Sequence, residues 1–351
     1  MKTRVLIVDD SATMRALLAR LLGSEADMEV IGAARDAMEA RGMIRELDPD
    51  VVTLDIEMPG MNGLDFLEKI MSLRPMPVVI VSGITQKGCE TTIRALELGA
   101  VDCYAKPDGA ASSLLENDGG TLARMVRDAA RIRFVRLPSK AAPVSPVPRQ
   151  TLAASRAVGG SGAHLIAIGA STGGVEALHH LLPAFPPTCP PTLIVQHISA
   201  AFAPAMAERL DRQCAARVKL LESGDVLRSG HIYIAPGNDR HAVVGGGPEN
   251  LIGKLMPGDL VSGHRPSIDM MFDSVAQRVG PASVGILLTG MGQDGARGLL
   301  SMRRAGARTI AQDEATCTVY GMPRAAADLG AAEKILPLPR IAERALSAAG
   351  L

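Results

Sequence analysis

Short apolar runs alternate with amphipathic helix patterns along most of this chain, and this alternation constrains the fold more than any other feature. The runs at 5–8, 51–54 and 77–82 are nearly continuous, which is typical of strands in a sheet that is covered on both faces. Between the first two runs, Met14 and four leucines up to Leu22 follow the spacing of a buried helix face. The pattern therefore predicts an α/β protein, and a length of 351 residues favours two domains.

A segment without periodicity separates two halves of the chain. Residues 1–136 read as five strand–helix units, with a last strand near 100–107 and a closing helix after it. Residues 137–162 are rich in Pro, Ala, Ser and Gly, which indicates a linker. Alternation resumes at 164. We expect a five-unit, doubly wound first domain and a second α/β domain that is doubly wound with a mostly parallel sheet.

Composition excludes several classes of protein. Lys plus Arg and Asp plus Glu both number 37, which argues against a dedicated nucleic-acid binder. No apolar run approaches the roughly 18 residues of a membrane span, and the N-terminus does not look like a signal peptide. This predicts no membrane insertion. The five cysteines form no C-x-x-C pair, so we expect a reducing cytoplasm.

Acidic residues follow two of the strands expected in the first domain. Asp9 and Asp10 come after the run at 5–8, and Asp55 follows the run at 51–54. The carboxyl ends of strands in an open α/β sheet are where ligands bind, and clustered carboxylates favour a hard divalent cation such as Mg²⁺. Lys106 could balance the charge, and Ser82 offers a hydroxyl to a phosphoryl oxygen. Each residue alone also fits a cap or turn, but together they favour Asp55 as a phosphoryl acceptor.

This constellation, with the stretches "LDIEMPGMNGLDFL" and "VDCYAKP", resembles the receiver domain of bacterial response regulators. The resemblance implies a receiver over 1–122 with a flavodoxin-like fold and a five-stranded parallel sheet, in which a histidine kinase phosphorylates Asp55. It also implies that Asp10 and Asp55 bind Mg²⁺, with help from Asp9 and the backbone carbonyl of Glu57.

One position departs from the receiver pattern. Receivers usually carry an aromatic residue three positions before the lysine, and here that position is Cys103. Tyr104 is next to it, but neighbouring strand residues face opposite sides of a sheet. How phosphorylation would be relayed therefore does not follow from the sequence.

The stretch "GASTG" at 169–173 fits G-x-S-x-G, with Ser171 at an expected strand-to-helix turn. The glycines and the free N–H groups of a helix start suit an activated nucleophile, whose oxyanion they could bind. They also suit a phosphate-binding loop or a purely structural turn. The dinucleotide pattern G-x-G-x-x-G is absent, which weakens the phosphate reading.

A serine nucleophile needs a base and an orienting acid. His197 is the best-placed base, because it directly follows the apolar run "PTLIVQ". The other histidines are less well placed: His179 and His180 on a helix surface, His164 and His231 before strands, and His241 and His264 in loops, where the last two stay open.

The candidate acid is Asp294, in a glycine-rich loop after an apolar strand, although an Asp before Gly is also common in simple turns. The resulting order is Ser, His, Asp. Common α/β-hydrolases have the order Ser, Asp, His, so this chain does not follow their pattern.

Six stretches of the second domain resemble the chemotaxis protein-glutamate methylesterases, the CheB family: "IGASTGG", "QHI", "YIAPG", "HRPSIDMMFDSVA", "LTGMGQDGA" and "AQDEATCTVYGMPRAA". The resemblance implies Ser171 as nucleophile, His197 as base and Asp294 as orienting acid. It further implies the backbone N–H of Met291 in the oxyanion hole, with Thr172 nearby. The domain boundaries that follow are 123–160 for the closing helix end and linker, and 161–351 for the catalytic domain.

The function implied is hydrolysis of glutamate γ-methyl esters on chemoreceptors during sensory adaptation, without a metal in the ester step. Deamidation of glutamine would be a second activity. The receiver is expected to cover the active-site edge until Asp55 is phosphorylated. Two alternatives remain, a non-catalytic receiver-adaptor signalling protein and a DNA-binding regulator. Neutral charge and the lack of a helix-turn-helix-like tail argue against the latter.

Overall fold

The computed structural model describes residues 2–58, 62–106, 120–132, 165–237, 239–247 and 250–351, which fall into two compact units, Met1–Arg136 and Leu137–Leu351. Both units are α/β, so the predicted fold class is confirmed. The predicted linker falls outside the described residues from position 133 to position 160. Within the described ranges, no helix is long and apolar enough to cross a membrane.

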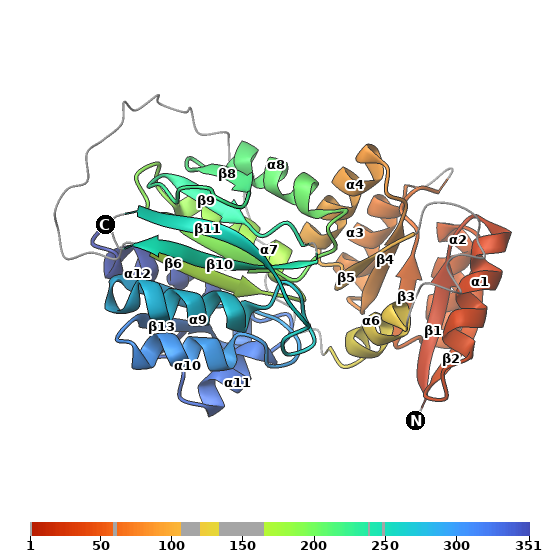
Figure 1. Cartoon of the computed structure of the whole chain (residues 1–351). Coiled ribbons are helices and arrows are strands. Elements are labelled where there is room, and N and C mark those ends of the chain that lie inside the picture. The colour runs from red at the N-terminus through yellow and green to blue at the C-terminus, as the bar shows by residue number, and fades with distance from the viewer. Residues whose placement is uncertain (1, 59–61, 107–119, 133–164, 238, 248–249) are drawn as a thin grey trace. The chain divides into compact units, whose positions relative to one another are not determined.

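The first unit is a five-stranded parallel sheet in the order β2-β1-β3-β4-β5, with helices on both sides of it (Figure 1). Its strands are β1 Thr3–Val8, β2 Met28–Ala34, β3 Val51–Leu54, β4 Val78–Ser82 and β5 Asp102–Ala105. Its helices are α1 Ala12–Gly23, α2 Ala37–Leu47, α3 Gly63–Leu73, α4 Gln86–Glu97 and α6 Thr121–Ala129.

This strand order is that of the flavodoxin-like fold, which the resemblance to receivers implied. β1, β3 and β4 are buried along nearly their whole length, because helices pack on both faces of the sheet. The direction of the winding reverses between β1 and β3, and ligands bind at the carboxyl ends of strands at such a point. The residues that follow β1 and β3 are the acids of the candidate pocket.

The second unit contains a seven-stranded parallel sheet in the order β14-β13-β12-β6-β7-β9-β8 and a separate two-stranded ribbon, β10-β11. The strands are β6 Leu165–Ala170, β7 Thr192–Gln196, β8 Arg217–Leu220, β9 His231–Ile234, β10 Arg240–Gly247, β11 Asn250–Pro257, β12 Ser283–Leu287, β13 Arg308–Gln312 and β14 Lys334–Leu336. The helices are α7 Gly174–Leu181, α8 Ala203–Gln213, α9 Ile268–Arg278, α10 Ala296–Arg304, α11 Met322–Asp328 and α12 Leu338–Ala348, with short 3₁₀ turns η1 Leu182–Ala184, η2 Gly280–Ala282 and η3 Glu314–Thr316.

The topological switch of the second sheet lies beside β6. From β6 the chain winds through β7 toward β8, and later returns to the other side of β6 with β12. The carboxyl ends of β12, β6 and β7 are therefore neighbours, although they are far apart in sequence. These three strands lead to the three residues of the candidate triad.

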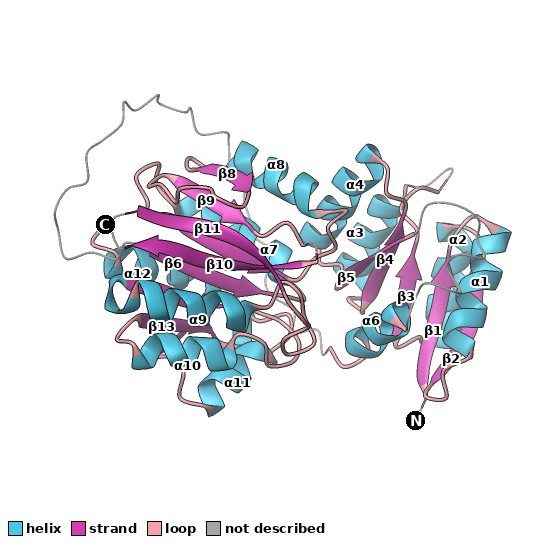
Figure 2. Ribbon diagram, viewed as in Figure 1, coloured by secondary structure: helices cyan, strands magenta, loops and turns pink. Residues whose placement is uncertain are grey.

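The ribbon of β10 and β11 is antiparallel and packs against α9 (Figure 2). Ala242, Val244 and Leu251 join Met271 and Val275 in the buried core, and the Ser274 hydroxyl accepts the backbone N–H of Val244 at 2.9 Å. The sequence reading of a loop around His241 was wrong, because this residue lies within β10 and is 1% exposed. The sequence did not predict a strand here because glycines usually mark turns, and β10 ends in the run Gly245–Gly247.

Candidate active site

Ser171 lies at the turn between β6 and α7, where the sequence placed it, and is only 9% exposed. Its N–H donates to the carbonyl of Thr289 at 3.0 Å, and its carbonyl accepts the N–H of Gly174 at 2.7 Å. Gly173 has a φ of 75°, a left-handed conformation that favours glycine. The amide of Gln196 donates to the carbonyl of Ser171 at 2.8 Å. These bonds fix the backbone that presents the hydroxyl.

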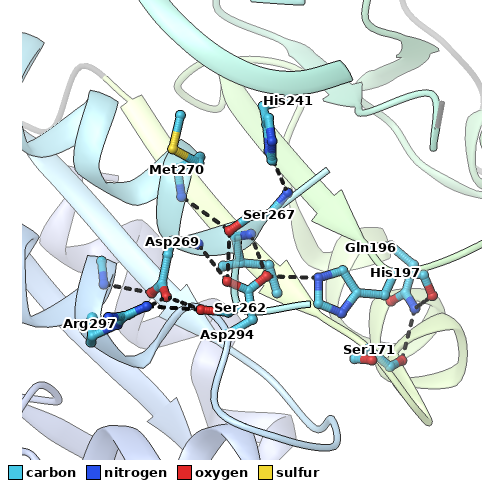
Figure 3. Close-up of polar contacts among 12 residues, drawn as sticks. Ser171, Gln196, His197, His241, Ser262, Ser267, Asp269, Met270, Asp294 and Arg297 are labelled. Atoms are coloured by element: carbon cyan, nitrogen blue, oxygen red, sulfur yellow. Dashed lines mark hydrogen bonds and ion pairs between the residues drawn. The ribbon is translucent and has the colours of Figure 1, made fainter. Parts of the chain in front are cut away.

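His197 follows β7 and is held beside β6 by a bond from its N–H to the carbonyl of Ala170 at 3.0 Å. Its Nε2 lies 3.0 Å from the Oδ2 of Asp294. Its Nδ1 is buried and has no hydrogen-bond partner in the described structure. Figure 3 shows the ring between Asp294 and Ser171, with Nδ1 on the Ser171 side. Since Asp294 accepts a proton from Nε2, Nδ1 is left as the basic nitrogen of the neutral ring.

Asp294 is fully buried and receives hydrogen bonds on both carboxylate oxygens. Oδ2 accepts from His197 and from the N–H of Ile268 at 2.7 Å, and Oδ1 accepts from the Ser267 hydroxyl at 2.8 Å and the N–H of Asp269 at 3.1 Å. Burial alone would raise the pKa of Asp294, but the hydrogen bond and charge of His197 together with these donors lower it below its ordinary value. The carboxylate therefore stays charged while it orients the imidazole.

The sequence did not predict the residues that hold Asp294. Ser267 is the N-cap of α9 and accepts the N–H of Met270 through its hydroxyl, and Ile268 and Asp269 form the first turn of that helix. Free N–H groups at a helix start bind anions, and the start of α9 binds the Asp294 carboxylate in this way. The signal available was a serine before an apolar helix, which marks a cap but does not identify its long-range partner.

The other histidines that the structure describes differ in their positions and contacts. The ring of His264 stacks on that of His197, with centroids 3.8 Å apart and planes 9° apart. His180 is exposed as predicted, but His179 is only partly exposed, because its Nδ1 lies 2.6 Å from the side-chain oxygen of Gln213. His231 is the first residue of β9, at the opposite edge of the sheet from the triad.

Two backbone N–H groups near Ser171 are available for an oxyanion. Within the described part of the chain, the N–H groups of Thr172 and Met291 have no acceptor. Gly290 directly precedes Met291, and a Cβ at position 290 would come 2.7 Å from the Cβ of Ser171. Glycine is required at position 290 because the backbone approaches Ser171 closely.

In the first unit, Asp9 and Asp55 are buried and Asp10 is exposed, as is Glu57. One carboxylate oxygen from each of the three aspartates lies within 4.8 Å of the others. The Nζ of Lys106 is 2.9 Å from Oδ2 of Asp9 and 2.6 Å from Oδ2 of Asp55. This set of hard oxygen donors fits a Mg²⁺ ion with several water ligands.

Burial and the neighbouring charges shift the pKa values of Asp9 and Lys106 in opposite directions. Burial raises the pKa of Asp9 above its usual value, although Lys106 works in the other direction. Burial also opposes the charge of Lys106, but the carboxylates of Asp55 and Asp9 outweigh it and raise the pKa of the ammonium. Ser82 is fully buried at the end of β4. The predicted pocket residues thus stand at the carboxyl ends of β1, β3, β4 and β5, where Lys106 joins Asp9 and Asp55.

Cys103 occupies β5 where receivers usually have an aromatic residue, and it is 2% exposed. Tyr104 is also buried, at 7% exposed. Alternation places the two side chains on opposite faces of β5, and helices cover both faces of the sheet. A buried tyrosine on the other face does not replace the missing aromatic residue.

Two family models match the chain, "Response regulator receiver domain" over residues 5–116 and "CheB methylesterase" over residues 166–345. A full-length relative from Caulobacter vibrioides, named protein-glutamate methylesterase/protein-glutamine glutaminase 1, is 52% identical over 349 residues, which are 99% of this chain and 98% of the relative. The chain belongs to the CheB family. The resemblance seen in the sequence is thereby confirmed.

Other members of the CheB family agree with this assignment. The protein-glutamate methylesterase/protein-glutamine glutaminase of Rhizobium etli is 52% identical and covers 98% of this chain. The crystal structure of the Thermotoga maritima CheB methylesterase catalytic domain is similar with a TM-score of 0.51 and 33% identity. It covers 53% of this chain and 98% of that domain. This CheB protein therefore combines a receiver with a methylesterase domain.

Proposed function

We propose that this CheB protein hydrolyses glutamate γ-methyl esters on chemoreceptors and that Ser171, His197 and Asp294 perform the reaction. One observation carries the proposal. His197 binds a buried carboxylate through Nε2, and its buried, unpartnered Nδ1 lies on the side of Ser171 (Figure 3). A neutral imidazole held in this way can accept the proton of a serine hydroxyl.

The reaction begins when the Oγ of Ser171 attacks the ester carbonyl and its proton passes to Nδ1 of His197. The N–H groups of Thr172 and Met291 are the proposed donors to the oxyanion of the tetrahedral intermediate. Asp294, held anionic by the start of α9, stabilises the imidazolium that forms. The C–O bond of the ester then breaks, and methanol leaves with the proton from Nδ1.

Water completes the cycle. His197 takes a proton from the water that attacks the acyl-enzyme and returns it to the Oγ of Ser171, so a free glutamate side chain is released. With a glutamine substrate the same acyl-enzyme forms and ammonia leaves in place of methanol. Deamidation thus uses the same residues, and the ester step needs no metal.

The receiver would regulate this chemistry. Asp55 is the proposed acceptor of a phosphoryl group from a histidine kinase, and Mg²⁺ would be held by Asp9, Asp10, Asp55 and the carbonyl of Glu57. A bound Mg²⁺ ion would supply positive charge to neutralise a phosphoryl group there. Lys106 already contacts Asp55, and Ser82 ends the neighbouring strand. With these partners the protein would act in the cytoplasm, where the signalling ends of chemoreceptors and their kinase would be met.

Methanol release from receptor membranes carrying labelled methyl esters tests the proposal. The wild-type chain should release methanol, faster with a small-molecule phosphodonor and Mg²⁺, while Ser171→Ala should lose the activity. Ser347→Ala is the matched control, because Ser347 is exposed on α12. Full activity of Ser171→Ala would reject the serine mechanism, and an inactive wild-type chain would favour the non-catalytic adaptor.

A further inference from the structure

We infer that His264 is a positioning residue, whose ring keeps the imidazole of His197 in the plane where Nε2 meets Asp294 and Nδ1 faces Ser171. The two rings are nearly parallel, 3.8 Å between centroids and 9° between planes. Asp294 fixes only one atom of the His197 ring, Nε2, and Nδ1 has no partner in the described structure. The stack acts on the face of the ring, which those edge contacts leave free.

The geometry blocks a specific motion. A half-turn of the imidazole about its Cβ–Cγ bond would carry Nδ1 and Nε2 away from the sides of Ser171 and Asp294. Midway through that turn the ring would stand perpendicular to its present plane. One of its edges would then be driven into the ring of His264, whose centroid lies 3.8 Å away. His264 thus opposes the loss of both contacts at once.

Backbone hydrogen bonds hold the segment that carries His264. Val261 and His264 exchange both backbone hydrogen bonds, at 3.0 and 3.1 Å, around a two-residue turn. Ser262 and Gly263 have φ values of 53° and 80°, as a tight hairpin turn of this kind requires. The turn therefore sets the position of His264 from its own backbone.

The turn is also tied to the structure that holds Asp294. The hydroxyl of Ser262 donates to Oδ2 of Asp269 at 3.0 Å, and the N–H of Asp269 donates to Asp294 (Figure 3). The same hydroxyl oxygen accepts a bond from Arg297 at 3.1 Å. One network therefore sets the position of the ring that stacks on His197 and of the acid that binds it.

His241 secures the other end of this segment. Its Nδ1 accepts the N–H of Ser267 at 3.1 Å, and its Nε2 then donates to the carbonyl of Asp259 at 2.8 Å. The segment 259–267 is thus bonded at both ends and at its turn. None of these bonds uses the side chain of His264, so they should persist when that side chain is truncated.

The consequence for catalysis rests on the proposed esterase function. Loss of the stack should reduce the fraction of time that Nδ1 faces Ser171, and so lower kcat while KM stays unchanged. His264→Ala should lower kcat by between about 10- and 100-fold, the range expected for misplaced catalytic groups. His264→Phe keeps a flat ring without a titrating nitrogen and should restore kcat to within about 3-fold of the wild type.

The experiment measures kcat and KM for methanol release by the full chain and records ¹⁵N NMR spectra of the His197 ring in each variant. The Nε2–H tautomer should give one sharp pair of ring signals in the wild type and in His264→Phe, and averaged signals in His264→Ala. The spectra report the stack even where no methanol is released, so they separate failure of this inference from failure of the esterase proposal. His231→Ala is the control, because this histidine stacks on Tyr233, with centroids 6.0 Å apart, at the far edge of the sheet.

Three results would overturn the inference. They are unchanged ring signals in His264→Ala, a change confined to KM, and a Phe variant as slow as the Ala variant. The last would show that a polar contact of His264, rather than its ring, is what matters.

Discussion

Two buried aspartates, one in each unit, follow strands of a parallel sheet, yet their surroundings differ. Asp55 binds a lysine ammonium and the N–H of Glu57, next to the exposed Asp10. Asp294 receives four hydrogen bonds, three of them from the cap and first turn of α9. The first carboxylate lies among charges that a bound ion or phosphoryl group would rearrange. The second carboxylate is held in one orientation, as its proposed role of orienting acid requires.

The comparison teaches that position at a strand end does not determine a role. Both carboxylates were found from the sequence by the same rule, that ligands bind at the carboxyl edge of a parallel sheet. What separates them is the partner: a long, flexible lysine chain in one case and a helix start in the other. The predictions below test this difference.

Substitution of the fixed acid should have the largest effect. Asp294→Asn must turn an NH₂ group toward either the N–H of Ile268 or the N–H of Asp269, because both carboxylate oxygens accept from backbone donors. We expect methanol release to fall by about 10⁴-fold, since the imidazole loses its orienting anion, and the free energy of unfolding to fall by about 1–3 kcal/mol. Kinetics and urea unfolding measure the two effects.

Asp273→Asn is the control for this change, because Asp273 lies on the same helix, outside the network. An Asp294→Asn protein with activity within about 10-fold of the wild type would show that Asp294 is a structural cap and not part of the reaction.

Crowding of the nucleophile should have the next largest effect. In Gly290→Ala the new methyl group would come 2.7 Å from the Cβ of Ser171 and 2.5 Å from the Sδ of Met322. The methionine can move but the serine backbone is fixed, so kcat should fall by about 100-fold. Gly247→Ala is the matched control, because nothing lies within 4 Å of the position that its new methyl group would take. Equal activity of the two variants would contradict the close approach.

The sequence predicted the positions of both sites but not what surrounds them. Ser171 and His197 stand immediately after apolar strands, so a one-dimensional pattern was enough to find them. The donors to Asp294 lie 25 to 27 residues away on α9, and the stack of His264 on His197 joins residues from different loops. Such contacts depend on how a ribbon and a helix pack, which local periodicity does not encode.

Removal of the proposed phosphoryl acceptor should change methanol release only when a phosphodonor is present. Asp55→Ala should abolish the stimulation of methanol release by a phosphodonor with Mg²⁺, a stimulation that we expect to be about 5- to 150-fold, the usual range of coupling between sites. Basal activity should be unchanged, because the triad lies in the other unit. Asp65→Ala on α3 serves as the control. Stimulation that survives in Asp55→Ala would place the acceptor elsewhere.

The smallest effect is a difference in pH dependence between the two units. Burial raises the pKa of Asp9 above its ordinary value of 3.8. As the pH rises above 3.8, this group therefore lowers the free energy of unfolding of the first unit. The pKa of Asp294 is lowered, so its contribution to stability is present above 3.8 and is lost as the pH falls below that value. Asp9→Asn should therefore stabilise the first unit at neutral pH, whereas Asp294→Asn should destabilise the second.

Hydrogen exchange in urea, followed for each unit separately at several pH values without divalent ions, measures this difference. Both substitution effects should shrink toward acid pH. Effects of the same sign in the two units would contradict the contrast between their carboxylates.

Labelling of Ser171 by a fluorophosphonate tests the central claim most directly, because the probe reacts with a serine that a base has activated. Mass spectrometry of the full-length chain should find the adduct on Ser171, formed at least about 10³-fold more slowly in His197→Gln. An adduct on another serine, or equal labelling of Ser171 without the His197 imidazole, would contradict the account.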